Sequence, residues 1–96
     1  MKYNFLVTPR AKKEFIDAYE YYEEKADDLG EKFRKEVYHF IYLIIDNPLH
    51  YPLKTKKQRE IVLKKFPFVI LFRIEEITKT IYVSSIFHTK RNPKLK

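Results

Sequence analysis

Apolar residues recur along residues 8–29 at the three- and four-residue intervals that define one face of a helix. They are Ala11, Phe15, Ala18, Tyr19, Tyr22, Ala26 and Leu29. Thr8 offers an N-capping oxygen and Pro9 suits the first helical turn, so we predict that the helix begins here. Acidic side chains fill most of the other face, which is typical of a helix that covers a core on one side only.

A second helix follows after a break at Asp27, Asp28 and Gly30, the only glycine of the chain. Its apolar positions keep the same period, at Phe33, Val37, Phe40, Ile41 and Ile44. It ends before Pro48, because a residue that precedes proline is pushed out of the helical region. Two amphipathic helices with a short connection predict an antiparallel helical hairpin.

Alternating apolar residues predict four strands, at residues 3–7, 59–64, 68–75 and 80–88, with a proline- and lysine-rich loop at 48–58. In the third strand, Phe68, Ile70, Phe72 and Ile74 share one face. In the fourth, Ile81, Val83, Ser85 and Phe87 alternate with Tyr82, Ser84, Ile86 and His88. The expected architecture is α+β, with the order β-α-α-β-β-β. One domain spans residues 1–96, and its helical hairpin packs on one face of a small, largely antiparallel four-stranded sheet.

The apolar face of the third strand is the natural surface for the two helices to cover. The opposite face of the sheet carries Arg73, and we expect Tyr82, Ser84 and His88 beside it from the neighbouring strand. This open and more polar face is the expected functional face.

The net charge of +7 lies entirely in the second half of the chain. Residues 1–48 carry eight Lys and Arg against ten Asp and Glu, whereas residues 49–96 carry twelve against three. Such a basic half favours an anionic partner, either nucleic acid or an acidic protein segment, although a solvated lysine surface gives the same count. The sequence has no signal-peptide pattern, no run long enough to span a bilayer and no cysteine, so we expect a cytoplasmic protein without membrane contact.

His88 is the leading candidate for chemistry, because an imidazole can act as a general acid or base near neutral pH. A ribonuclease also needs cations around the phosphorane, and Arg73, Arg91, Lys90 and Arg59 are the candidates. The alternative is that His88 only ends a strand and hydrogen-bonds the backbone. No residues have metal-ligand spacing and one glycine cannot form a phosphate loop, so neither a metal nor a cofactor is expected.

Other side chains are candidates for contact with a nucleic acid or another target. Lys54, Lys56 and Lys57 form a cluster that attracts phosphate or is simply solvated. Tyr82 is less securely internal than the phenylalanines, so it can stack on a base or pack against the sheet.

Several motifs occur in a characteristic order along almost the whole chain. They are Thr-Pro-x-Ala at the start of the first helix, Tyr-Tyr near its end, Asn-Pro after the second helix, Phe-Pro-Phe-Val-Ile-Leu-Phe-Arg, and a final His-Thr-Lys-Arg-Asn-Pro. In this order and spacing the chain resembles the RelE/ParE superfamily of type II toxin–antitoxin toxins, often described as plasmid-stabilisation proteins. The resemblance implies a toxin that is neutralised by a cognate antitoxin. RelE-like members cut messenger RNA in the ribosomal A site, and ParE-like members inhibit DNA gyrase without known nuclease chemistry.

Individual positions help to choose between the two branches. Arg59 matches an arginine often seen at the start of the second strand, and His88 with Arg91 fits the His-x-x-Arg ending of the family. Val69 stands where ribonuclease members often have an arginine, and no tyrosine follows His88. We therefore favour the ParE-like, gyrase-directed reading. The alternatives are a ribosome-dependent endoribonuclease, in which His88 shuttles protons while Arg73 and Arg91 stabilise the phosphorane, and a non-toxic RNA- or protein-binding module of the same fold.

Overall fold

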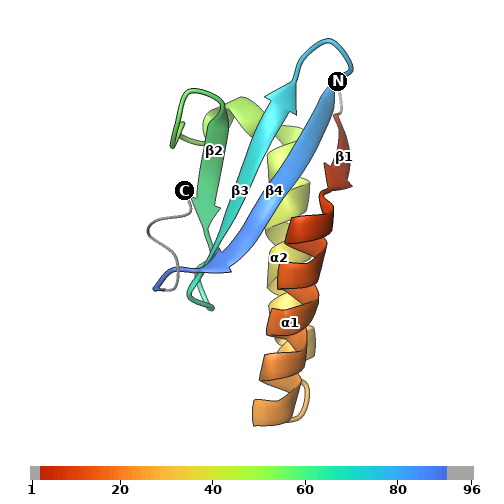
Figure 1. Cartoon of the computed structure of the whole chain (residues 1–96), viewed down its shortest axis with the longest axis vertical. Coiled ribbons are helices and arrows are strands. Elements are labelled where there is room, and N and C mark those ends of the chain that lie inside the picture. Colours follow the sequence, from red (N-terminus) through yellow and green to blue (C-terminus); the bar gives the residue numbers. More distant parts are fainter. Residues whose placement is uncertain (1–2, 91–96) are drawn as a thin grey trace.

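The computed structural model describes residues 3–90, and its elements follow the predicted order (Figure 1). They are β1 (Asn4–Val7), α1 (Pro9–Lys25), α2 (Leu29–Asp46), a short 3₁₀ helix (Pro48–His50), β2 (Gln58–Val62), β3 (Phe68–Glu75) and β4 (Thr80–His88). The strands form one sheet in the order β1-β4-β3-β2. Because β1 pairs with β4 in parallel and the other pairs are antiparallel, the sheet is mixed but largely antiparallel, as predicted.

Helix α1 begins as its sequence indicates. The side-chain oxygen of Thr8 accepts a hydrogen bond from the N–H of Ala11 at 3.2 Å, and Pro9 occupies the first turn. The same hydroxyl donates to the carbonyl of Ser84 at 3.2 Å, so the start of α1 is fastened to β4. Neither described helix has the length and apolar character that a membrane span requires.

The break between the helices differs in detail from the prediction. Asp28 adopts the left-handed conformation with φ of 67°, so the aspartate makes the turn. Gly30 lies inside α2 and is buried. A Cβ at this position would stand 2.5 Å from Cγ of Glu23 and 2.9 Å from the carbonyl oxygen of Tyr19. Glycine is therefore needed for the close approach of α2 to α1, and the turn itself does not require it.

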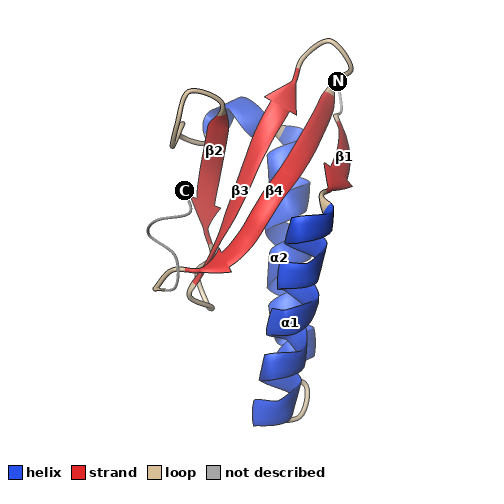
Figure 2. Cartoon of the chain, in the orientation of Figure 1, coloured by secondary structure: helices blue, strands red, loops and turns tan. Residues whose placement is uncertain are grey.

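The two helices lie on one side of the sheet (Figure 2), and the core fills the space between the helices and the sheet. Its largest fully buried side chains come from α2, β3 and β4: Phe33, Val37, Ile44, Ile70, Phe72, Ile81, Val83 and Ile86. The prediction that Phe68, Ile70, Phe72 and Ile74 face the helices is confirmed, since the first three belong to this core and Ile74 packs against it.

The predicted alternation along β4 is wrong beyond Val83. Phe72 pairs with Val83 but Leu71 pairs with Ser85, so Ser84 is an extra residue that forms a β-bulge. One extra residue reverses which side chains face which side of the sheet. Ile86 consequently joins the helix-side core, while Phe87 joins Val69 and Leu71 in a small buried cluster on the other face.

Candidate functional site

His88, the last residue of β4, lies on the helix side of the sheet. Its Cα partner across the sheet is Phe68, a member of the helix-side core, and the two rings meet edge-to-face with centroids 5.3 Å apart. The expectation that His88 shares the open face with Arg73 is therefore wrong. The cause is the bulge at Ser84, which turns every later side chain of β4 to the opposite side.

The imidazole borders a cavity of about 520 Å³ between α1 and the end of β4. Its lining also includes Asp17, Ala18, Tyr21, Tyr22, Phe68 and Lys90. The backbone N–H of Lys90 donates to Nδ1 of His88 at 3.1 Å. A neutral imidazole with Nδ1 as acceptor carries its proton on Nε2, so this ring can still donate through Nε2.

The helix side of this cavity is partly apolar and partly charged. Burial raises the pKa of Tyr22, with the neighbouring Tyr21 phenol as a second cause. The carboxylate of Asp17 pairs with Lys13 at 3.2 Å on the exposed side of α1. An imidazole, phenols, a carboxylate and the nearby lysine give the cavity both hydrogen-bond donors and acceptors.

Arg73 and Tyr82 form a separate group on the opposite face of the sheet. The guanidinium carbon of Arg73 lies 4.2 Å from the ring centroid of Tyr82, its partner across β3 and β4. This is a close cation–π contact. Beside it, the hydroxyl of Ser84 donates to Oε1 of Gln58 at 3.1 Å. Arg73, Tyr82 and Ser84 thus share the open face as predicted.

The structure does not bring His88 and Arg73 together. Tyr82, which stacks with Arg73, is six residues from His88 along β4, which corresponds to about 20 Å of strand. The two side chains also point to opposite faces of the sheet. They cannot contact one phosphate at the same time in this arrangement. Arg91, the third residue predicted for catalysis, lies outside the described residues.

The predicted basic loop lies near Arg73, because Gln58 at the start of β2 pairs with Arg73. Lys54, Lys56 and Lys57 are exposed there. Arg59 is held differently, since its guanidinium donates to the carbonyl of Tyr51 at 2.7 Å. That bond anchors the loop to β2 and gives Arg59 a structural contact within the chain.

Sequence reasoning missed that α1 contributes to the site around His88. Tyr21 and Tyr22 were visible as a motif, but their helical spacing indicated core packing only. The bulge at Ser84 turns the end of β4 toward α1, and no local sequence pattern predicts this bulge. Within residues 3–90, no group of three His, Asp or Glu side chains is arranged to hold a metal ion.

Residues 5–93 match the family described as the ParE toxin of the type II toxin–antitoxin system parDE. The chain belongs to this toxin family. No curated protein sequence matches it closely enough to count as a relative. The predicted resemblance to the RelE/ParE superfamily, with the ParE-like branch favoured, is confirmed by this match.

Solved structures agree with the fold of this ParE-family toxin. The chromosomal ParDE system of Pseudomonas aeruginosa superimposes with a TM-score of 0.79 at 16% identity, covering 92% of this chain and 97% of the other. The isolated Escherichia coli RelE toxin gives 0.70 at 16% identity, over 95% and 88% of the two chains. A toxin–antitoxin complex of Mycobacterium tuberculosis, RelBE2, gives 0.63 at 16% identity, over 92% and 99%. At this identity the likeness concerns the fold.

Proposed function

We propose that this ParE-family toxin arrests growth by binding DNA gyrase in the cytoplasm, and that a cognate antitoxin keeps it inactive. The observation that carries the gyrase-directed reading is the separation of His88 from Arg73. His88 ends β4 on the helix side of the sheet, whereas Arg73 lies in β3 on the open face, opposite Tyr82 near the start of β4.

Cleavage of RNA requires a proton-transfer group and cations within a few ångströms of one phosphate. Arg73 is engaged with Tyr82 on the open face, and His88 faces the cavity beside α1. Val69 is buried among apolar residues at the position where ribonuclease relatives often carry an arginine. A protein that acts by binding a large target needs no such convergence of groups, which favours the gyrase-directed reading.

The antitoxin part of the proposal rests on related assemblies and on charge. The ParDE and RelBE2 structures are named as toxin–antitoxin systems, and they share this fold. The second half of the chain carries twelve basic against three acidic residues. Such a surface suits an acidic antitoxin segment, whose binding would be weakened by salt.

A ribosome-dependent endoribonuclease is the second candidate, and the cavity around His88 favours it. Among the described residues none bonds Nε2 of His88, so this atom can transfer a proton there, with Tyr22 and Lys90 in the same lining. In that mechanism His88 acts as acid or base, and Lys90 replaces Arg73 as the nearby cation.

Induced expression without an antitoxin separates these readings. We expect growth arrest, intact messenger RNA by primer extension, an induced DNA-damage response, and inhibition of supercoiling when purified toxin is added to gyrase. Codon-phased cuts in messenger RNA would overturn the gyrase reading and support the endoribonuclease. Normal growth would exclude both toxin mechanisms and support a non-toxic RNA- or protein-binding module of the same fold.

His88→Ala tests the second candidate directly. Loss of a general acid or base lowers the cleavage rate by about 10²–10⁴-fold. His50→Ala is the matched control, because His50 is exposed at the end of the 3₁₀ helix that precedes β2. The melting temperature of each variant shows whether lost activity reflects lost folding.

A further inference from the structure

Strand β1 forms one edge of the sheet, and its outer side carries backbone groups without partners. In Figure 2, β1 is the outermost strand, and no helix or strand lies beyond it. The N–H groups of Asn4 and Thr8 donate to carbonyls of the neighbouring chain at 2.9 and 3.1 Å, so the even-numbered residues bond on the β4 side. The N–H and C=O groups of Phe5 and Val7 therefore point away from the sheet. Within residues 3–90, no other segment bonds to them.

The side chains of β1 are apolar and exposed on both faces of the sheet. Leu6 pairs with Tyr82 on the open face and is 55% exposed. Phe5 and Val7 lie on the helix side and are 37% and 36% exposed. The strand has no charged residue, no proline and no bulge, which are the features that keep edge strands from pairing. An edge of this kind is a template for another strand.

Both ends of β1 are fixed, so this edge is preformed. Before the strand, the hydroxyl of Tyr3 donates to the carboxylate of Glu76 at 3.4 Å, and the ammonium of Lys79 lies 5.3 Å from the Tyr3 ring centroid. After the strand, the hydroxyl of Thr8 donates to the carbonyl of Ser84. Preformed sites lose little conformational entropy when they bind.

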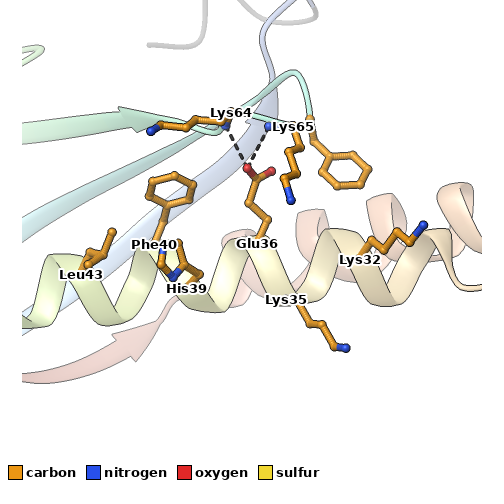
Figure 3. A pocket seen from close by; sticks show the side chains of 9 residues that line it. Lys32, Lys35, Glu36, His39, Phe40, Leu43, Lys64 and Lys65 are labelled. Carbon is orange, nitrogen blue, oxygen red and sulfur yellow. Dashed lines mark hydrogen bonds between the residues drawn. The ribbon is translucent and has the colours of Figure 1, made fainter.

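The opposite edge of the sheet, β2, is largely covered by the chain itself. The preceding loop donates to the carbonyl of Gln58 at 2.6 Å and accepts the N–H of Glu60 at 3.2 Å. Directly after β2, Oε2 of Glu36 accepts the N–H groups of Lys64 and Lys65 at 3.0 and 2.8 Å (Figure 3). In the part of the chain that the structure describes, β1 is thus the more open edge.

We propose that β1 pairs with β1 of a second copy of this chain, in antiparallel orientation, so that the two four-stranded sheets become one continuous sheet. With Leu6 on the two-fold axis, Phe5 stands opposite Val7 of the second copy, and their outward N–H and C=O groups exchange hydrogen bonds in both directions. The two Leu6 side chains meet on the open face, and Phe5 packs on Val7 on the helix side. This pairing uses the open edge of both copies, so the assembly closes at two.

The pattern of β1 selects a second copy as the occupant. Apolar side chains match one another about Leu6 on both faces, as a two-fold axis requires. A two-fold axis also places each charge near its own copy, and a strand without charges avoids that repulsion. An acidic segment would find no lysine on this strand to bind. The inference goes beyond the proposed function, because it requires neither gyrase nor an antitoxin.

Disulfide trapping on the purified full chain tests the register, because the chain has no cysteine of its own. Residues that face each other in a non-hydrogen-bonded antiparallel pair have Cα atoms about 4.5 Å apart, which a disulfide can span. Leu6→Cys should therefore form a covalent dimer under mild oxidation. Asn4→Cys is the matched control, because Asn4 is exposed on the same strand but would stand about 14 Å from its own copy. We expect the control to be trapped at least about tenfold more slowly.

Sedimentation velocity measures the equilibrium. We expect a dissociation constant in the micromolar range, because a strand of four residues buries less than the standard interface of about 800 Å² per partner. Salt should strengthen the dimer, because each copy has a net charge of +7. Leu6→Lys places two ammonium groups against each other on the axis and should weaken the dimer by about tenfold or more. Leu49→Lys is the matched control, because it removes a leucine that is 59% exposed in the 3₁₀ helix, and it should change the affinity by less than about twofold.

The trapping experiment decides alone if Leu6→Lys lowers the melting temperature. A chain that stays monomeric up to about 1 mM would overturn the proposal, and so would an edge that pairs only with an added antitoxin segment. Equal trapping of Leu6→Cys and Asn4→Cys would overturn it, because random collisions would then explain the covalent dimer. Equal effects of Leu6→Lys and Leu49→Lys, or a dimer that salt weakens, would place the contact elsewhere and overturn it as well.

Discussion

Glu14 holds α1 to β4 at the point where β4 loses its other strand partner. β1 pairs with β4 only as far as Val83. Beyond that residue, Oε1 of Glu14 accepts the hydroxyl of Ser85 at 2.7 Å and the backbone N–H of Ile86 at 2.9 Å. Ser85 is only 3% exposed, so its hydroxyl has little access to water. One helical carboxylate thus replaces a missing strand directly after the bulge.

Glu14→Ala removes the oxygen that accepts both hydrogen bonds and leaves a buried hydroxyl and a backbone N–H unpaired. Each hydrogen bond to a charged group contributes about 1.5–3 kcal/mol, and the 26% exposure of the Glu14 side chain reduces this. We expect a loss of about 2–4 kcal/mol, which corresponds to a fall in Tm of about 10–25 °C for a domain of this size. Glu14→Gln should lose only about 1 kcal/mol, because its carbonyl oxygen can accept both bonds.

Urea unfolding at neutral pH measures these losses, and a double-mutant cycle with Ser85→Ala isolates the shared bond. Arg10→Ala is the control for the exposed ion pair between Arg10 and Glu14, 3.4 Å long, which contributes about 0.5 kcal/mol at most. A loss below about 0.5 kcal/mol for Glu14→Ala would refute the reasoning. Strict additivity of Glu14→Ala and Ser85→Ala would refute it equally.

Three other predictions concern contacts elsewhere in the fold. Glu36→Ala should lower the free energy of unfolding, measured in urea, by about 1–2 kcal/mol. The loss stays this small because the two exposed N–H groups of Lys64 and Lys65 can bond to water instead. An unchanged urea midpoint would contradict the contact. Gly30→Ala should lower the free energy of unfolding by about 1–3 kcal/mol, because the new Cβ meets the side chain of Glu23 and a backbone carbonyl of α1. This net loss is expected despite a gain of about 1 kcal/mol in helix propensity. A more stable variant would show that α1 can move away from α2 at little cost. Burial raises the pKa of Tyr22, so above pH about 10 the unfolded chain releases its proton first and stability falls as pH rises. In Tyr22→Phe the urea midpoint should therefore fall less steeply between about pH 9 and 11 than in the unmodified protein. An identical slope in the two proteins would refute the raised pKa of Tyr22.

The sequence was sufficient to predict the elements because their signals are local. The capping oxygen of Thr8 accepts a hydrogen bond from an N–H only three residues away. The helical period of α2 can be read from the spacing of the apolar residues within that helix. The apolar face of β3 also follows from simple alternation within eight residues. The family could be inferred for the same reason, since its motifs follow one another along the chain.

The arrangement of the candidate site was decided by contacts between distant residues. Nothing around Ser84 in the sequence distinguishes a regular strand from a bulged one. The hydroxyl and N–H just after the bulge are bound by Glu14, 71 and 72 positions away. The residue identities determined the helices, the strands and the presence of an imidazole at the end of β4. Only the tertiary structure revealed the bulge at Ser84, which turns His88 toward the helices and away from Arg73, because a shift of one residue reverses every later side chain of a strand.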